Sequence, residues 1–159
     1  MSKYVNNPLL YFNYKCTNLK KATDKAIRTG LRKGMKELRD SARTNLKSSV
    51  KGSTRKNPKY KDTLVSGIRS YSPMRSKKNK AEITSAVKIT SNKKKGSGSF
   101  RLAILEQGTV LRRTKKGYFR GSLKAYRFFQ KANSVVSESK IQSYIDREMQ
   151  TALRELNEK

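Results

Sequence analysis

The sequence contains no histidine and only one cysteine, Cys16. A lone cysteine excludes a disulfide within this chain, and with it the class of small secreted domains held together by disulfides. Without histidine the chain lacks the commonest general base and the commonest metal ligand. No serine, threonine or cysteine can be activated by a histidine partner. We therefore expect no enzyme, no cofactor and no metal site.

Acidic side chains are also scarce, with eleven Asp and Glu against thirty-nine Lys and Arg, a net charge of +28. They include no pair set in an apolar run, where burial would raise a carboxyl pKa for acid–base catalysis. Such an excess of positive charge repels itself in an isolated monomer and favours a polyanionic or acidic partner. Residues 1–127 carry the whole excess, with 34 basic and 6 acidic side chains, whereas residues 128–159 hold five of each.

Long apolar runs are missing too. No run approaches the roughly 18 residues of a membrane-spanning helix, so we expect no membrane partner. The first residues, MSKYVNNPLLYFNY, are too few and too polar for a signal peptide. We expect a protein that is made in the cytoplasm and stays soluble.

The chain is long enough for one domain with a core of its own, and its hydrophobic pattern predicts that domain over residues 17–159. Residues 1–16 are predicted to be an arm, either ordered against a neighbour or frayed. Apolar residues spaced by three and four predict a long helix to about Ser48, capped by Thr17 or Asn18. Gly30 and Gly34 lie on its apolar face, where we expect close approach of another backbone. Its opposite face is basic, which is typical of a solvated face.

Two strands are predicted further along, over residues 69–75 and 81–90. The second has the clearer alternation, with Ile83, Ser85, Val87 and Ile89 on one face. A final helix, starting at Ser134 or Ser137, carries another apolar face. The predicted fold is α+β: a long N-terminal helix and a C-terminal helix packed on a small antiparallel sheet, with extended basic loops.

The densest apolar residues flank a cationic loop in the stretch Phe100–Ala132, FRLAILEQGTVLRRTKKGYFRGSLKAYRFFQKA. The run 100–107 fits either a short helix or a buried strand. We favour a helix of two turns that ends at Gly108, which suits a left-handed C-terminal position. We expect the core to hold the ends of the loop together and leave its middle in water. A small hairpin is predicted at residues 117–122. The residues expected to hold the ends are Leu102, Leu105, Phe128 and Phe129.

Two features of this stretch have alternative interpretations. Tyr118, Phe119 and Tyr126 could stack on bases, but aromatics beside a buried helix are more often part of the core, which is our prediction. Glu106 ends an apolar run and is the one candidate for catalysis. For Glu106 we favour a structural role, either as a helix cap or in an ion pair with Arg112 or Arg113.

The charge of the loops predicts contact with phosphates, which needs no sequence readout. No zinc-finger spacing, ribonucleoprotein aromatic motif or leucine zipper is present, so we expect no sequence-specific reader. The GSGS segment at 96–99 lacks the ending of a phosphate-binding loop. The predicted contacts to DNA or to an acidic partner are Arg75, Lys77, Lys78, Lys80, Lys93, Lys94, Lys95, Arg112, Arg113, Lys115 and Lys116.

Several segments, in their order, resemble one protein family. Residues 62–69, DTLVSGIR, are similar to a Thr-Gly-x-Leu-x-x-Ser-Ile segment, and residues 101–109, RLAILEQGT, to Tyr-Ala-x-Phe-Leu-Glu-Phe-Gly-Thr. Residues 125–132, AYRFFQKA, are similar to Pro-x-x-Phe-Leu-x-x-Ala, without its proline. With the long helix before and the helix after them, they resemble the small tail-completion or neck proteins of tailed bacteriophages. That family is named after gene product ten of the Hong Kong ninety-seven phage. The structural motif comprises Leu102, Leu105, Glu106, Gly108, Thr109, Phe128 and Phe129.

The resemblance implies a virion structural protein at the head–tail junction, made in the host bacterial cytoplasm and acting by assembly. It implies a homo-oligomeric ring of six or twelve copies around the DNA channel. The implied partners are neighbouring neck or tail proteins and the packaged double-stranded DNA. The alternative is a non-specific nucleic-acid-binding protein that works outside the particle. A nuclease is a distant third interpretation, since histidine is absent and carboxylates are few.

Overall fold

A computed structural model of the chain describes residues 10–15, 21–58, 63–77, 82–89 and 98–157. Over these residues three strands form an antiparallel sheet in the order β1-β3-β2. The elements, in chain order, are β1 (Leu10–Lys15), α1 (Lys21–Ser49), the 3-10 turn η1 (Val65–Gly67), β2 (Ile68–Arg75), β3 (Glu82–Ile89), α2 (Gly98–Gln107), α3 (Phe128–Val135) and α4 (Glu138–Asn157). The predicted α+β class is confirmed.

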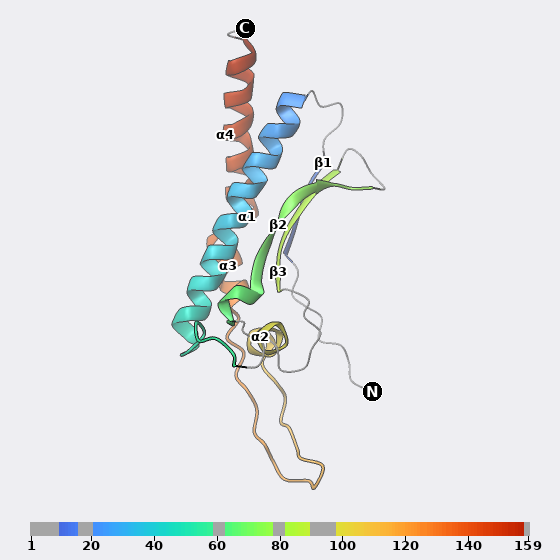
Figure 1. Cartoon of the computed structure of the whole chain (residues 1–159). Coiled ribbons are helices and arrows are strands. Elements are labelled where there is room, and N and C mark those ends of the chain that lie inside the picture. The colour runs from blue at the N-terminus through green and yellow to red at the C-terminus, as the bar shows by residue number, and fades with distance from the viewer. Residues whose placement is uncertain (1–9, 16–20, 59–62, 78–81, 90–97, 158–159) are drawn as a thin grey trace.

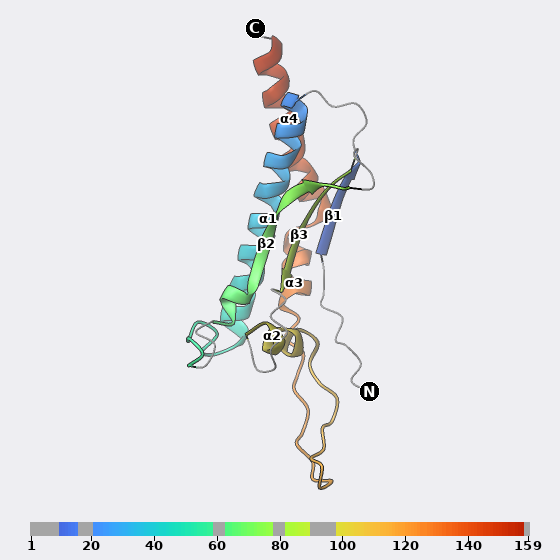
Figure 2. The same cartoon turned by 45° about the vertical axis from the view of Figure 1, so that its right-hand side comes forward.

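Helix α1 is the element that the others share, because it contacts α3, α4, β2 and β3. It runs beside the sheet and beside α4, as Figures 1 and 2 both show, while α2 lies at one end of the sheet. The apolar stripe predicted for α1 is buried from Ile27 to Leu46 and joins one continuous core with the sheet and the other helices. The fully buried large side chains include Ile27, Leu31, Met35, Leu38, Leu46, Ile68, Ile83, Ile89, Leu102, Phe128, Phe129 and Ile145.

The predicted strand alternation in β3 is confirmed. Ile83, Val87 and Ile89 are fully buried or nearly so, and Ser85 between them donates its hydroxyl to the carbonyl of Tyr71 at 2.7 Å. The partner strand β2 runs antiparallel, with Ile68 opposite Ile89. A buried hydroxyl that forms a hydrogen bond costs little folding free energy, so Ser85 is tolerated on the apolar face of the strand.

Strand β1 differs from the sequence prediction, which placed residues 10–15 in an arm outside the domain. All six residues pair with β3, from Leu10 opposite Val87 to Lys15 opposite Glu82. LYFNYK alternates, with Leu, Phe and Tyr at one set of positions and Tyr, Asn and Lys at the other, but the segment is only six residues long and its partner lies some 70 residues away. Residues 1–9 and the proposed caps Thr17 and Asn18 lie outside the described residues.

The two glycines of α1 sit where α4 crosses it, as predicted. A Cβ on Gly30 would lie 2.6 Å from the Cα of Ile145, and one on Gly34 would lie 3.0 Å from side-chain atoms of Ile141. The absence of a side chain at these positions therefore sets how closely the two helices approach.

Part of the basic face of α1 is in contact with β2, although the sequence pattern is typical of a solvated face. Arg28 donates to the carbonyl of Pro73 at 2.9 Å, and Arg43 donates to that of Ile68 at 2.8 Å. Burial at this contact lowers the pKa of the Arg43 guanidinium, which remains charged at any physiological pH. These arginines satisfy two carbonyls of β2, and that of Pro73 lies where the pairing of β2 with β3 is irregular.

A polar cluster fastens α4 to α1 beside the glycine contact. Glu37 accepts hydrogen bonds from the Lys140 ammonium at 2.6 Å and from the Tyr144 hydroxyl at 2.5 Å. These two bonds hold the pKa of Glu37 below its ordinary value, while the same carboxylate raises the pKa of Lys140 and of Tyr144. All three groups are therefore in their bonded protonation states at neutral pH.

Replacing Gly30 by alanine should destabilise the fold. Overpacking against the backbone of Ile145 costs on the order of 1–3 kcal/mol, against about 1 kcal/mol that alanine gains over glycine inside a helix. Urea unfolding followed by circular dichroism should show a lower midpoint for Gly30→Ala than for the wild type. The matched variant Gly34→Ala should lose less stability, because its added Cβ meets only the side chain of Ile141 and not its backbone. A Gly30→Ala variant more stable than the wild type would contradict the close packing.

Acid should weaken the Glu37 cluster. Since the folded pKa of Glu37 is lowered, its contribution is complete above the unfolded pKa of about 4.3 and is lost as pH falls through the folded value. The difference in urea midpoint between the wild type and Glu37→Gln should be largest near neutral pH and disappear in acid. Tyr144→Phe, which removes one of the two bonds, should show a smaller difference. A difference that does not change with pH would refute the charge-assisted pairing.

Candidate functional site

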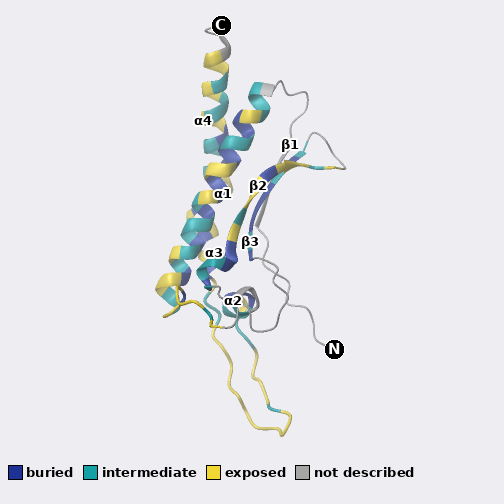
Figure 3. Ribbon diagram, viewed as in Figure 1, coloured by how far each residue is buried: buried dark blue, intermediate teal, exposed yellow. Residues whose placement is uncertain are grey.

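The most prominent feature of the structure is a long hairpin that leaves the body between α2 and α3, formed by residues 108–127 and called here the hairpin (Figure 1). Both of its arms extend from the body, and almost all of it is exposed (Figure 3). The sequence predicted only a small hairpin at residues 117–122. Backbone hydrogen bonds make it longer: Thr109 N to Leu123 O at 2.9 Å, Arg112 N to Gly121 O at 3.1 Å, Arg120 N to Arg112 O at 2.7 Å, and Thr114 N to Tyr118 O at 2.8 Å.

The first arm starts at Gly108, which ends α2 as predicted. Its φ of +74° is left-handed, and its amide donates to the carbonyl of Ile104 at 2.7 Å. A Cβ at this position would lie 2.7 Å from the carbonyl oxygen of Leu123 in the returning arm. Glycine is therefore required twice over, by its backbone conformation and by the close approach of the second arm.

Glu106 fastens the returning arm. Its carboxylate is buried, with 6% of the residue exposed, and accepts the amides of Phe129 at 3.1 Å and Gln130 at 3.3 Å. These are among the free amides of the first turn of α3, whose own N-cap residue, Arg127, makes no side-chain cap. A carboxylate at a helix N-terminus is also favoured by the helix dipole.

The predicted capping role of Glu106 is thus confirmed, for a helix that lies 22 residues further along the chain and was not itself predicted. In the described part of the chain its carboxylate bonds to the backbone of α3 and not to Arg112 or Arg113. Two backbone bonds complete the closure, from Tyr126 N to Leu105 O at 2.9 Å and from Arg127 N to Glu106 O at 3.3 Å. We call this set of contacts the clamp.

The remaining motif residues also lie at the base of the hairpin. Thr109 accepts the amide of Leu123 on its hydroxyl at 2.9 Å. Leu102, Phe128 and Phe129 are fully buried or nearly so, and Leu105 packs against the core from its edge. The prediction that these side chains hold the ends of the loop together is confirmed.

The cations of the hairpin are displayed to solvent, as predicted. Arg112, Arg113, Lys115 and Lys116 are exposed or nearly so, and Arg120 joins them on the returning arm. Tyr118 and Phe119, by contrast, are 70% and 66% exposed, so their prediction as core residues is wrong. Tyr126 is partly buried against the core, as expected.

Exposed apolar side chains therefore share the hairpin with its cations. They are Val110, Leu111, Tyr118, Phe119 and Leu123. The guanidinium of Arg113 lies over the Phe119 ring, 4.4 Å from its centroid. Between Gly108 and Gly121 the apolar residues follow neither a helical nor a strand period, and glycines and lysines lie among them. This irregular pattern is the sequence signal that the segment is a loop and not part of the core.

The other predicted contacts are not gathered at the hairpin. Arg75 ends β2 at the far end of the sheet, near the start of α1, where it pairs with Asp24 at 2.9 Å (Figures 1 and 2). Lys77 follows it and is exposed. Lys78, Lys80, Lys93, Lys94 and Lys95 lie outside the described residues. Of the predicted cationic positions, the structure therefore places four on one projecting segment and two at the other end of the molecule.

The exposed groups of the hairpin include several cations and large apolar side chains, which are groups of a binding surface. Within the described ranges, no cluster of three or more potential metal-binding side chains is found. No described helix combines the length and apolarity needed to cross a membrane. A hairpin of mixed cationic and apolar character suits a partner that offers both acidic groups and apolar surface.

Removing the cap should loosen the clamp. Glu106→Gln keeps the side-chain shape but turns an amide NH₂ toward one of the two backbone donors, and we expect a loss of about 1–2 kcal/mol in unfolding free energy. The matched variant Glu138→Gln removes an exposed carboxylate from the first turn of α4 and should lose less, about 0.3–1 kcal/mol from the helix dipole alone. The midpoints of urea unfolding of both variants and of the wild type measure these losses. Equal midpoints for Glu106→Gln and the wild type would show that the cap is not needed.

No protein-family model, no curated protein and no solved structure matches the chain.

Proposed function

We propose that the chain is a structural protein of a tailed bacteriophage virion, placed at the head–tail junction as a neck or tail-completion protein. In this proposal it assembles into a ring of six or twelve copies around the DNA channel, against neighbouring neck or tail proteins. It is made in the host bacterial cytoplasm and acts by assembly. The sequence resemblance suggests the family, and the clamped hairpin is the observation that carries the proposal.

The hairpin supports assembly because of what it exposes. Isolated subunits rarely display several large apolar side chains on one projecting segment, and such a patch marks a surface that a partner covers. Val110, Leu111 and Phe119 are each at least 66% exposed. The clamp fixes both ends of the segment on the body, which lowers the entropy that a partner must overcome on binding.

The net charge supports a position beside DNA. A charge of +28 strongly opposes the packing of several copies unless a polyanion lies near them. Packaged double-stranded DNA supplies that polyanion, and contact with its phosphates releases counterions without reading sequence. A ring around a DNA channel therefore reconciles the charge of the chain with its assembly.

The second candidate is a non-specific nucleic-acid-binding protein outside the particle. The exposed rings of Tyr118 and Phe119 favour it, because bases of single strands stack on such rings next to cations. The three exposed aliphatic residues of the hairpin have no comparable use on a nucleic acid, which is why we place this function second.

Particle composition tests the proposal. Intact virions of the encoding phage, and heads and tails after gentle dissociation, should contain the chain at a fixed copy number of six or twelve. Quantitative mass spectrometry against labelled peptides from residues 128–159 gives that number. If the chain is absent from particles while the pure protein binds DNA, the neck assignment fails and the free binder replaces it.

Salt dependence reports whether the hairpin touches phosphates. If it does, replacing Arg112, Arg113, Lys115 and Lys116 by glutamine should lower the slope of log affinity against log salt by about 3–4, since each duplex phosphate contact contributes about 0.9. Fluorescence anisotropy with a labelled duplex measures the slope. A control that replaces the exposed Lys25, Arg32, Lys36 and Lys47 of α1 by glutamine matches the charge change. An equal fall in both variants would refute a specific role for the hairpin.

A further inference from the structure

Three cations from three different elements lie close together where α1 passes the start of β2. They are Arg43 of α1, Arg69 of β2 and Lys88 of β3. Arg69 and Lys88 are opposite each other in the antiparallel register, so their side chains leave the same face of the sheet. Arg43 reaches β2 one residue earlier, where its guanidinium donates to the carbonyl of Ile68 at 2.8 and 3.2 Å. We call these three residues the cationic cluster.

The neighbours of the cationic cluster hold it in place without neutralising it. The uncharged carbonyl of Ile68 accepts two of the five N–H groups of Arg43. The ammonium of Lys88 lies over the ring of Tyr71, 4.0 Å from its centroid, and Arg69 donates to a carbonyl of η1 at 3.4 Å. None of the three forms an ion pair with any residue that the structure describes. The cluster therefore presents three positive charges at defined positions.

Bringing these charges together costs folding free energy. Like charges directly opposite each other on one face of a sheet destabilise it, and Arg69 and Lys88 have this arrangement. Burial lowers the pKa of Arg43, and the nearby charges of Arg39 and Arg69 lower it further, while Asp40 acts in the opposite direction. Asp40 is already paired with Arg39 at 2.8 Å. A bound anion would relieve this repulsion.

We propose that the cationic cluster binds the phosphates of duplex DNA. The inference rests on the proposed function for the identity of the polyanion, and it names a surface of the body through which each subunit meets the packaged DNA. Two of the three cations are guanidinium groups, whose planar N–H groups match the geometry of phosphate oxygens. Such contacts need no readout of the bases.

The surroundings of the cluster favour a phosphate backbone over an acidic protein. Protein interfaces are centred on large apolar side chains, and the hairpin exposes several of these, including Phe119. Beside the cluster, Ile68 and Ile89 are fully buried or nearly so. Tyr71 is 39% exposed, and Lys88 lies over its ring. A charged surface of this kind suits a phosphate backbone, which offers no apolar surface in return.

The cluster lies toward the end of the body from which the hairpin projects. The turn η1 directly precedes β2 and contacts α2, and α2 leads into the hairpin. Figures 1 and 2 both show the start of β2 beside the end of α1 and near α2. The cluster and the cations of the hairpin together give the subunit one strongly basic end.

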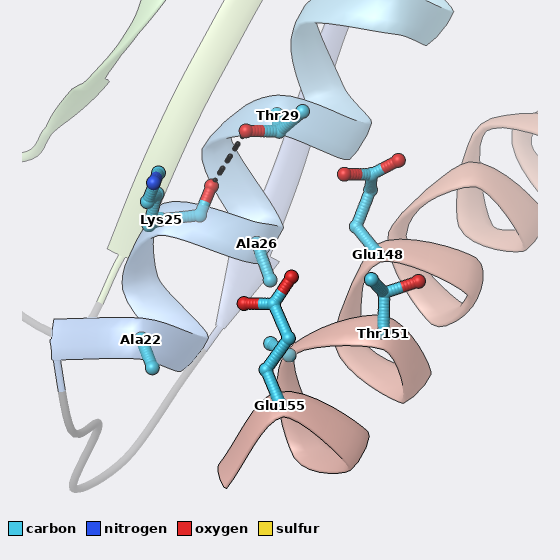
Figure 4. Close-up of a pocket in the computed structure, with 8 residues that line it drawn as sticks. Ala22, Lys25, Ala26, Thr29, Glu148, Thr151 and Glu155 are labelled. Carbon is cyan, nitrogen blue, oxygen red and sulfur yellow. Dashed lines mark hydrogen bonds between the residues drawn. The ribbon is translucent and has the colours of Figure 1, made fainter. Parts of the chain in front are cut away.

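Cations at the opposite end have carboxylates beside them. A groove between α1 and α4 is lined there by Glu148 and Glu155, which reach from α4 toward α1 (Figure 4). Lys25 lines the same groove, and Arg75 pairs with Asp24 at 2.9 Å. These cations are therefore partly neutralised, unlike those of the cluster, and we expect DNA to bind at the cluster.

Salt-dependent binding of the pure protein tests the cluster. Fluorescence anisotropy with a labelled duplex gives the affinity over a series of salt concentrations. Replacing Arg69 and Lys88 by glutamine should lower the slope of log affinity against log salt by about 2, since each duplex phosphate contact contributes about 0.9. At physiological salt the affinity should fall about tenfold or more.

Two control variants separate the position of the charges from their number. Lys25→Gln, Arg32→Gln removes two exposed cations of α1 outside the cluster and should leave the slope nearly unchanged. Arg69→Lys, Lys88→Arg keeps both charges of the cluster and should bind like the wild type. Circular dichroism establishes that each variant is folded. If the double glutamine variant does not fold, the single variant Arg69→Gln, at an exposed position, carries the test with an expected change in slope of about 1.

An unchanged slope in the cluster variant would overturn the inference. An equal fall in the Lys25→Gln, Arg32→Gln control would overturn it too, because binding would then follow net charge alone. Polyglutamate serves as the acidic-protein probe. If it binds more tightly than the duplex, and the cluster variant loses that binding, the cluster belongs to an acidic protein and the inference fails. Particle composition decides the proposed function separately, because DNA binding by the pure protein does not depend on a place in the virion.

Discussion

The hydrogen bonds from the amides of α3 to the buried carboxylate of Glu106 are the constraint on which the hairpin depends. Helix α3 begins at a left-handed arginine that supplies no cap, so its first amides need an acceptor from elsewhere. The last turn of α2 supplies it, and the side chain that satisfies α3 also brings the two ends of a 20-residue excursion together. A two-stranded hairpin is only marginally stable in water by itself. The clamp, Gly108 and the buried pair Phe128 and Phe129 provide the anchoring that the hairpin lacks.

Some charged side chains hold the body of the protein together, whereas others are exposed on the hairpin. Arginines of α1 satisfy carbonyls of β2, and acidic residues near the contact between α1 and α4 form ion pairs with lysines of the facing helix. Each of these two helices supplies one carboxylate and one lysine to the pairs, so the contact between α1 and α4 is locally neutral in a strongly basic chain. The exposed cations of the hairpin form no ion pair with any residue that the structure describes, so they are available to an acidic or polyanionic partner.

The sequence predicted the elements with strong periodicity and failed where structure depends on distant partners. The helix ending near Ser48, the strand of Ile83 and Val87, and the left-handed Gly108 all carry local patterns that a single segment reveals. β1 was missed because its pairing with β3 is remote and its alternation covers only six residues. Capping by Glu106 was predicted, but its partner helix was not, because the signal for α3 depends on an acceptor 22 residues earlier. The exposure of Tyr118 and Phe119 was mispredicted because aromatic residues are usually buried, and only the hairpin geometry removes them from the core.

Hydrogen exchange at single amides tests the central claim, which is that Glu106 holds the hairpin on the body. In the wild type, the amides of Phe129, Gln130, Thr109 and Leu123 should exchange more slowly than those of Lys115 and Lys116 at the tip. In Glu106→Gln, the four should lose protection together, while the amides of α1 beside Ile145 keep theirs. If the amides at the base stay protected without the carboxylate, or if they exchange as fast as the tip in the wild type, the clamp does not exist as described.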